Sequence, residues 1–279
     1  MNIGIIGAGK VGTALGAYLS ERHIPVSGFY SKTFKSAASA ADFTDTKAYQ
    51  NLETLVKASD TLFITTPDGQ IAEVWDCIVK YGVADKIVCH FSGSLSSYVF
   101  SGTEQAGAKG CSIHPVYAFS DKFSSHLEFH KALLTMEGHL EAVTVMQELF
   151  EGLGHQVFIV SSEDKVKYHA AAAMASNYMV GLFQMSIKLL MECGFSKEEG
   201  RILLAPLVAG NAAAMVEKGA AGALTGPVER GDAETVQKHL EALKGNPAEI
   251  VYREIGKELV AIAEEKNPRR NYTALKNIF

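Results

Sequence analysis

The sequence has few of the features that bind nucleic acid, form the disulfides of a secreted protein or span a membrane. Its 26 basic and 31 acidic residues give a net charge of −5 with no basic block, which argues against a nucleic-acid partner. Four cysteines are scattered without C-x-x-C spacing, so we expect buried thiols in a reducing, cytoplasmic setting and no metal site. The N-terminus lacks a signal-peptide pattern, and the long apolar stretch Ala170–Met191 contains Asn177, Gln184 and Lys188, so we expect no membrane span.

The first dozen residues carry the clearest motif. The apolar run Asn2–Ile6 is typical of a buried parallel strand, and a G-x-G-x-x-G pattern follows it directly, before apolar residues at helical spacing. The first glycine permits a tight turn, the second lets a pyrophosphate approach the backbone, and the third lets the helix pack against the strand. We therefore predict a dinucleotide-binding turn formed by Gly7, Gly9, Lys10, Val11 and Gly12.

The residues after the second strand pattern, Val26–Tyr30, indicate which dinucleotide is bound. An NAD site usually has a carboxylate there to accept from the ribose 2′-hydroxyl. This chain instead has Ser31 and Lys32, followed by Lys35, and no carboxylate before Asp42. A hydroxyl and an ammonium group suit a 2′-phosphate, so we predict NADP as the cofactor. The alternative is that the two lysines are only solvated loop charges.

Strand and helix patterns alternate up to residue 162, which predicts an α/β fold with a doubly wound parallel sheet. The expected later strands are Thr61–Thr65, Ile87–His90, Gly110–Ile113, Ala132–Glu137 and Gln156–Val160. Ligands bind outside the carboxyl ends of such strands. This rule places five residues on the cofactor side: Thr66, Pro67, Ser92, Gly93 and His114.

Residues 163–279 contain no strand pattern and predict an all-helical domain. Lys165–Cys193 is expected to be one long helix ended by Gly194. Ser196 and Glu199 form a capping-box pattern for the next helix. The last segment, 267–279, is expected to be a loosely held tail.

Three further stretches carry a resemblance to a known group: Ser112–Phe119 (SIHPVYAF), Tyr168–Asn177 (YHAAAAMASN) and Leu224–Asp232 (LTGPVERGD). With the glycine motif, the chain resembles the phosphogluconate dehydrogenase superfamily, which includes ketopantoate reductase and pyrroline-carboxylate reductase. Within it, the chain is similar to a short-subunit, dehydrogenase-like oxidoreductase family of unknown function. The resemblance covers nearly the whole chain. It implies a Rossmann domain over 1–162, an all-helical substrate and dimerisation domain over 163–279, and a homodimer that pairs through the helical domain.

Hydride transfer to a C=O or C=N group requires a nearby proton donor and a group that holds the substrate's charge. In the superfamily the donor is often a lysine one turn before an asparagine, but Ala173 stands at that position here. We therefore predict His114 as the first candidate donor and His169 as the second. Asn177, about 80° from His169 around an ideal helix, would orient the substrate or cofactor, and Arg230 would bind an anionic group of the substrate. For each of the four, a purely structural role is the alternative.

The leading functional prediction is an NADP-dependent oxidoreductase that transfers a hydride to or from a small polar, anionic carbonyl, hydroxyl or imine compound bound between the domains. One alternative is an NADP(H)-binding sensor or assembly protein without catalysis. Another is a reductase that couples NADP to a flavin or deazaflavin. We expect no metal, no nucleic-acid or membrane partner, a homodimer and a cytoplasmic location.

Overall fold

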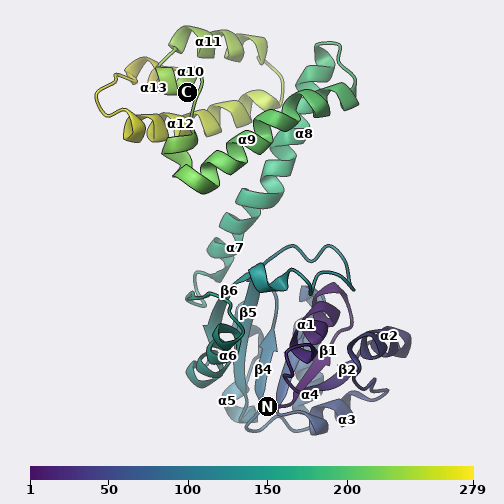
Figure 1. Ribbon diagram of the computed structural model, residues 1–279. Coiled ribbons are helices and arrows are strands. Elements are labelled where there is room, and N and C mark those ends of the chain that lie inside the picture. The colour runs from purple at the N-terminus through teal and green to yellow at the C-terminus, as the bar shows by residue number, and fades with distance from the viewer. The chain divides into compact units, whose positions relative to one another are not determined.

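The computed structural model describes all 279 residues as two compact units, Met1–Ser176 and Asn177–Phe279 (Figure 1). Contacts thus assign the first helix after residue 162 to the first unit, whereas the sequence places the boundary before it. The first unit contains one seven-stranded sheet in the order β2-β1-β3-β4-β5-β6-β7. Its strands are β1 Ile3–Ile6, β2 Val26–Tyr30, β3 Thr61–Ile64, β4 Ile87–His90, β5 Lys109–Val116, β6 Leu133–Gly138 and β7 Val157–Ile159.

The predicted α/β fold with a doubly wound sheet is confirmed, with one antiparallel pair added. The first five strands pair in parallel, whereas β6 runs antiparallel to β5. A parallel return needs a crossover, usually a helix, and the connection to β6 contains only the short 3₁₀ turn Phe129–Lys131. Pairing with β6 also extends β5 past the expected end at Ile113, because His114 lies opposite Thr135.

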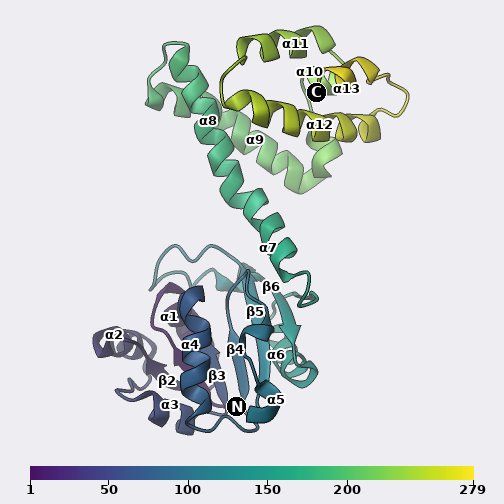
Figure 2. The same ribbon diagram turned by 180° about the vertical axis from the view of Figure 1, so that it is seen from behind.

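Helices cover both faces of this sheet, and each face has its own apolar core (Figures 1 and 2). Side chains of α1, α2 and α6 form one core with alternate strand residues such as Ile5 and Phe63. Side chains of α3 and α4 form the other with Leu62 and Ile64. The helices are α1 Lys10–Ser20, α2 Phe34–Thr44, α3 Leu52–Ala58, α4 Asp68–Val79, α5 Thr103–Ala106, α6 Leu140–Gly152 and α7 Lys165–Ala173.

The expected single helix over Lys165–Cys193 is interrupted. A π-helical turn, Met174–Tyr178, separates α7 from α8, Met179–Glu192. A π turn contains more residues per turn than an α-helix, so the ideal-helix angle predicted between His169 and Asn177 does not apply.

The second unit is all-helical, as predicted. Its elements are α8, α9 Lys197–Ala223, α10 Pro227–Arg230, α11 Ala233–Ala242, α12 Ala248–Lys266 and α13 Thr273–Ile278. The capping box of Ser196 and Glu199 is present at the start of α9, and Gly219, with φ of 71°, breaks that helix near its end. The expectation of a loose tail is wrong. Tyr272 and Leu275 are buried, because α13 packs its apolar side chains against α12 and α11.

The cysteine expectation holds in part. Cys89 and Cys111 are buried free thiols on neighbouring strands, with 3.7 Å between their sulfur atoms. Cys77 is partly buried and Cys193 is exposed, so those two do not match the expected burial.

Candidate functional site

The glycine turn joins β1 to α1 as the sequence predicts, and two of its glycines are required by the backbone. Gly7 has a φ of +114°, and a Cβ there would lie 2.8 Å from the carbonyl carbon of Thr65. A Cβ on Gly12 would overlap the carbonyl oxygen of Gly7, so only glycine allows α1 to pack this closely. Gly9, in contrast, has open space on its Cβ side, which leaves its backbone free for a ligand to approach.

A cavity of about 540 Å³ opens beside this turn at the carboxyl ends of β1, β2 and β3. Gly7 and Gly9 line it, whereas Lys10, Val11 and Gly12 do not. From the other elements, the predicted cofactor residues that line it are Ser31, Lys32, Thr66 and Pro67. The structure therefore gathers these six predicted residues around one space.

Two features of the cavity wall fit a dinucleotide phosphate. The hydroxyl oxygen of Thr66 is buried and has no hydrogen-bond partner within the chain. Ser31 and the exposed Lys32 lie at the end of β2 beside Thr33 and Ser36, whose hydroxyl groups are 2.8 Å apart. A hydroxyl-rich wall with one free ammonium group suits an anion with several acceptor oxygens.

Ser92 and Gly93 lie outside this cavity, in the loop after β4. The Ser92 hydroxyl donates to Asp68 Oδ2 at 2.7 Å, and Ser94 donates to the same oxygen at 3.2 Å. Asp68 is the first residue of α4, directly after Pro67. Asp68 is not predicted from the sequence, although its position after Thr66-Pro67 at a strand end was the available signal.

His90, at the end of β4, forms hydrogen bonds to the backbone of this loop. Its ring is fully buried, its Nδ1 accepts from the backbone N–H of Ser92 at 3.2 Å, and its Nε2 lies 3.2 Å from the carbonyl oxygen of Ser96. These partners assign the ring proton to Nε2. Burial lowers the pKa of His90 to about 4, the charge of Lys165 adds to this, and the Ser96 hydrogen bond opposes it.

The structure brings His114 and His169 together over Gly93. Their ring centroids are 5.7 Å apart. A Cβ on Gly93 would overlap His169 Nδ1 and lie 2.8 Å from His114 Nε2. His169 Nδ1 is buried and has no hydrogen-bond partner. Gly93 is thus the position at which both imidazole rings converge.

Burial lowers the pKa of His114 to about 4, and the nearby charges of Lys165 and His169 lower it further. At neutral pH the ring is therefore uncharged and acts as a hydrogen-bond donor or a base, not as a charged acid. Its Nδ1 lies 2.8 Å from the hydroxyl oxygen of Tyr168. Tyr168 is not predicted as a site residue from the sequence, although it precedes His169 directly.

Lys165, the first residue of α7, is fully buried, and its Nζ has no hydrogen-bond partner. Burial lowers its pKa, while the buried carboxylate of Glu137 opposes that shift. Glu137 accepts from the Ser97 N–H and hydroxyl at 2.8 Å each and from Ser162 at 2.5 Å. The first unit therefore holds a buried amine whose charge acts on His114 and His90, which the sequence showed only as a lysine at a helix start.

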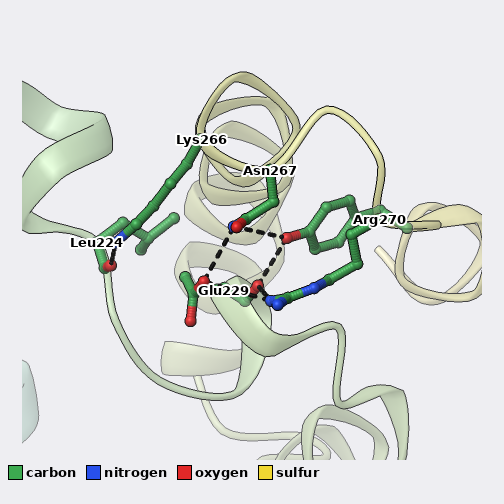
Figure 3. A network of polar contacts seen from close by, with 6 residues as sticks. Leu224, Glu229, Lys266, Asn267 and Arg270 are labelled. Atoms are coloured by element: carbon green, nitrogen blue, oxygen red, sulfur yellow. Dashed lines mark hydrogen bonds and ion pairs between the residues drawn. The ribbon is translucent and has the colours of Figure 1, made fainter.

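Asn177 and Arg230 belong to the second unit. Arg230 ends α10, and its exposed side chain makes no hydrogen bond or ion pair. Its position is fixed by a network around Glu229 (Figure 3). The Glu229 carboxylate accepts from Asn267 at 2.9 Å and Arg270 at 3.3 Å, and its carbonyl oxygen accepts from Tyr272 at 2.6 Å. Asp232 caps α11 by accepting from Thr235 N–H.

Comparisons with known proteins agree with this fold. Residues 1–115 match the model of a Rossmann-like domain, and residues 132–259 match a domain of unknown function, DUF2520. Protein TM1727 from Thermotoga maritima is 25% identical with a TM-score of 0.77, over 96% of this chain and 100% of that one. No match was found among curated proteins.

Two more distant solved structures share the fold. BF3122 from Bacteroides fragilis, described as a candidate NADP oxidoreductase, is 22% identical with a TM-score of 0.69, over 93% of this chain and 98% of that one. A reductive aminase from Aspergillus terreus, in complex with NADPH and ethyl-5-oxohexanoate, is 15% identical with a TM-score of 0.66, over 100% of this chain and 99% of that one. The chain thus has a Rossmann-like dinucleotide-binding fold followed by a helical unit.

Proposed function

We propose that this protein is an NADP-dependent oxidoreductase that transfers a hydride to or from a small polar, anionic carbonyl, hydroxyl or imine compound. The observation that carries the proposal is the glycine turn at the cavity, whose wall also bears Ser31, Lys32 and the unpartnered hydroxyl of Thr66. The fold that this chain shares with a reductive aminase in complex with NADPH supports it.

In this proposal, different residues of the chain bind different parts of the cofactor and the substrate. Gly7 and Gly9 leave room for the pyrophosphate at the N-terminus of α1, and Ser31 with Lys32 holds the 2′-phosphate. When bound, the nicotinamide supplies the hydride. His114 and His169 hold the reacting group of the substrate above Gly93. Asn177 and Arg230 remain proposed substrate contacts from the helical unit.

Thermal unfolding with NADPH and with NADH tests the cofactor assignment. A ligand at 100 times its Kd adds about 2.7 kcal/mol of stability, so NADPH should raise Tm strongly and NADH weakly. Lys32→Ala should weaken NADPH roughly 10- to 100-fold, the worth of a charge-assisted hydrogen bond, and leave NADH nearly unchanged. Lys35→Ala is the matched control, since Lys35 does not line the cavity. Equal losses for both cofactors in Lys32→Ala would contradict the NADP assignment.

Measurements of NADPH turnover distinguish this function from the sensor role and from the flavin or deazaflavin reductase. NADPH oxidation is followed by absorbance with small keto acids and cyclic imines, and then with flavin and deazaflavin as acceptors. Tight NADPH binding without oxidation by any of them would favour a sensor or assembly role. Oxidation only by the flavin or deazaflavin would favour a reductase that serves a second redox cofactor.

We also propose that the protein is a cytoplasmic homodimer that pairs through the helical unit. Val180, Leu182, Ile202, Leu207 and Val216 are exposed apolar side chains of α8 and α9. The stretch Lys197–Arg230 is apolar enough to pass for a membrane span by length and composition, but a second copy of the chain would equally cover it. Light scattering should give twice the mass of one chain, and a monomer that binds lipid vesicles would contradict this proposal.

A further inference from the structure

The contact between Tyr168 and His114 fixes which ring nitrogen of His114 carries the proton. Tyr168 Oη lies 2.8 Å from His114 Nδ1, and a hydrogen bond from the Thr135 hydroxyl acts to lower the pKa of the phenol. Burial raises the pKa of Tyr168, so the phenol keeps its proton at neutral pH. Because Thr135 donates to the phenol oxygen, the phenol proton is directed to His114 Nδ1, and the neutral ring carries its own proton on Nε2.

The protonated nitrogen lies beside Gly93, where the reacting group is proposed to bind. His114 Nε2 lies 2.8 Å from the point that a Cβ on Gly93 would occupy, and the unpartnered His169 Nδ1 converges on the same point. A group bound above Gly93 thus meets an N–H donor from His114. The buried, hydrogen-bond-free amine of Lys165 lies close enough for its charge to lower the pKa of His114. Both features favour an acceptor atom that gains negative charge.

We propose that the reacting group of the substrate is a carbonyl, whose oxygen accepts the Nε2–H of His114, and that Tyr168 is the positioning residue that fixes this tautomer. This inference rests on the proposed oxidoreductase function and narrows its substrate class. A carbonyl oxygen has two lone pairs and no proton, so it fits a fixed N–H donor. An imine accepts a hydride as its protonated iminium form, whose nitrogen carries a proton and a positive charge, so it would meet one donor with another beside a buried amine.

The chemistry balances with a carbonyl. In a reduction, NADPH would supply the two-electron hydride to the carbonyl carbon and be oxidised to NADP⁺, while the π-electron pair of the C=O bond would move to the oxygen. The Nε2–H hydrogen bond stabilises the charge that develops on this oxygen, which takes one proton from water to become a hydroxyl. His114 keeps its proton and Tyr168 stays a neutral phenol throughout.

NMR of the full chain with ¹⁵N-labelled histidine rings tests the tautomer without any turnover. At pH 6 to 8, His114 should show a protonated Nε2 and an unprotonated Nδ1, with His114→Gln assigning the signals. Tyr168→Phe should produce a mixture of the two tautomers. Tyr98→Phe is the matched control, because it removes a surface hydroxyl that bonds Glu163. A His114 ring protonated at Nδ1 in the unmodified chain would overturn the proposal.

A substrate panel tests the class itself. With NADPH, 2-keto acids should be reduced with higher kcat/KM than cyclic imine carboxylates of matched size. Tyr168→Phe should lower kcat for the keto acids about 2- to 10-fold, the worth of one hydrogen bond, while KM changes little. Reduction of the imines alone, or no reduction by an NADPH-bound chain, would overturn the carbonyl assignment. If the unmodified chain did not bind NADPH, the proposed oxidoreductase function itself would be contradicted.

Discussion

His90 should make the stability of the first unit depend on pH below neutrality. In the folded chain its pKa is lowered to about 4 from 6.5, chiefly by burial. The unfolded chain therefore binds a proton at this ring as pH falls below about 6.5, and the folded chain does not. The stabilisation is fully present above pH 6.5 and is lost as pH falls toward 4. At about 1.36 kcal/mol per pH unit, the loss reaches about 2.5 kcal/mol by pH 4.5.

His90→Asn isolates this contribution. The Asn carboxamide oxygen can still accept from the Ser92 N–H, but the side chain no longer titrates. Lys165, Glu137 and Asp68 also face His90 and remain unchanged in the variant. Urea unfolding, followed by fluorescence of the buried Trp75, is compared at pH 7 and pH 4.5.

The variant should be less stable than the unmodified chain at pH 7, because it loses the hydrogen bond to the Ser96 carbonyl oxygen. Its stability should then fall by about 2.5 kcal/mol less on acidification. His130→Asn is the control, since this histidine is exposed. If the unmodified chain and His90→Asn lost the same stability between pH 7 and pH 4.5, the reasoning about His90 would be refuted.

Three further predictions concern other parts of the chain. Gly9→Ala should keep Tm but weaken the binding of NADPH. Gly12→Ala should lower stability by about 1–3 kcal/mol, because its Cβ overlaps the Gly7 carbonyl oxygen. Calorimetry measures Tm and fluorescence titration measures NADPH binding, and equal Tm values for the two variants would contradict this prediction. Glu229→Ala should cost about 1–3 kcal/mol in urea unfolding, since it removes the carboxylate that accepts from Asn267 and Arg270, and Glu229→Gln should cost less. Lys165→Met should raise the pKa of His114 above about 4 in an NMR titration, and an unchanged pKa would show that the amine does not act on this ring.

The elements that local sequence patterns specify were predicted well. The strand, glycine turn and helix at the N-terminus are read from adjacent residues, and Val26–Tyr30 is a strand over the predicted range. The capping box at Ser196 is likewise a local signal, because both partners lie within one helical turn. Where the pattern depends on a few neighbouring residues, the sequence alone was sufficient.

The features that depend on distant packing were not predictable in this way. The extension of β5 through His114 depends on its pairing with β6, which lies beyond a long connection. The bond between His114 and Tyr168 joins residues 54 positions apart. The burial of Lys165 likewise follows from where α7 packs, and a lysine at a helix start is ordinarily exposed. His114 and His169 were predicted individually, but their convergence on Gly93 was not.

Gly93 also provides a way to sort related sequences. Its φ lies outside the left-handed region, so the backbone alone would accept alanine or serine there. Only the two imidazole rings that crowd its Cβ position require glycine. In a set of aligned relatives, glycine at this position should therefore vary together with the two histidines. A relative that carries a side chain here must have moved or lost at least one ring, and this would identify relatives with a different chemistry before any of them is purified.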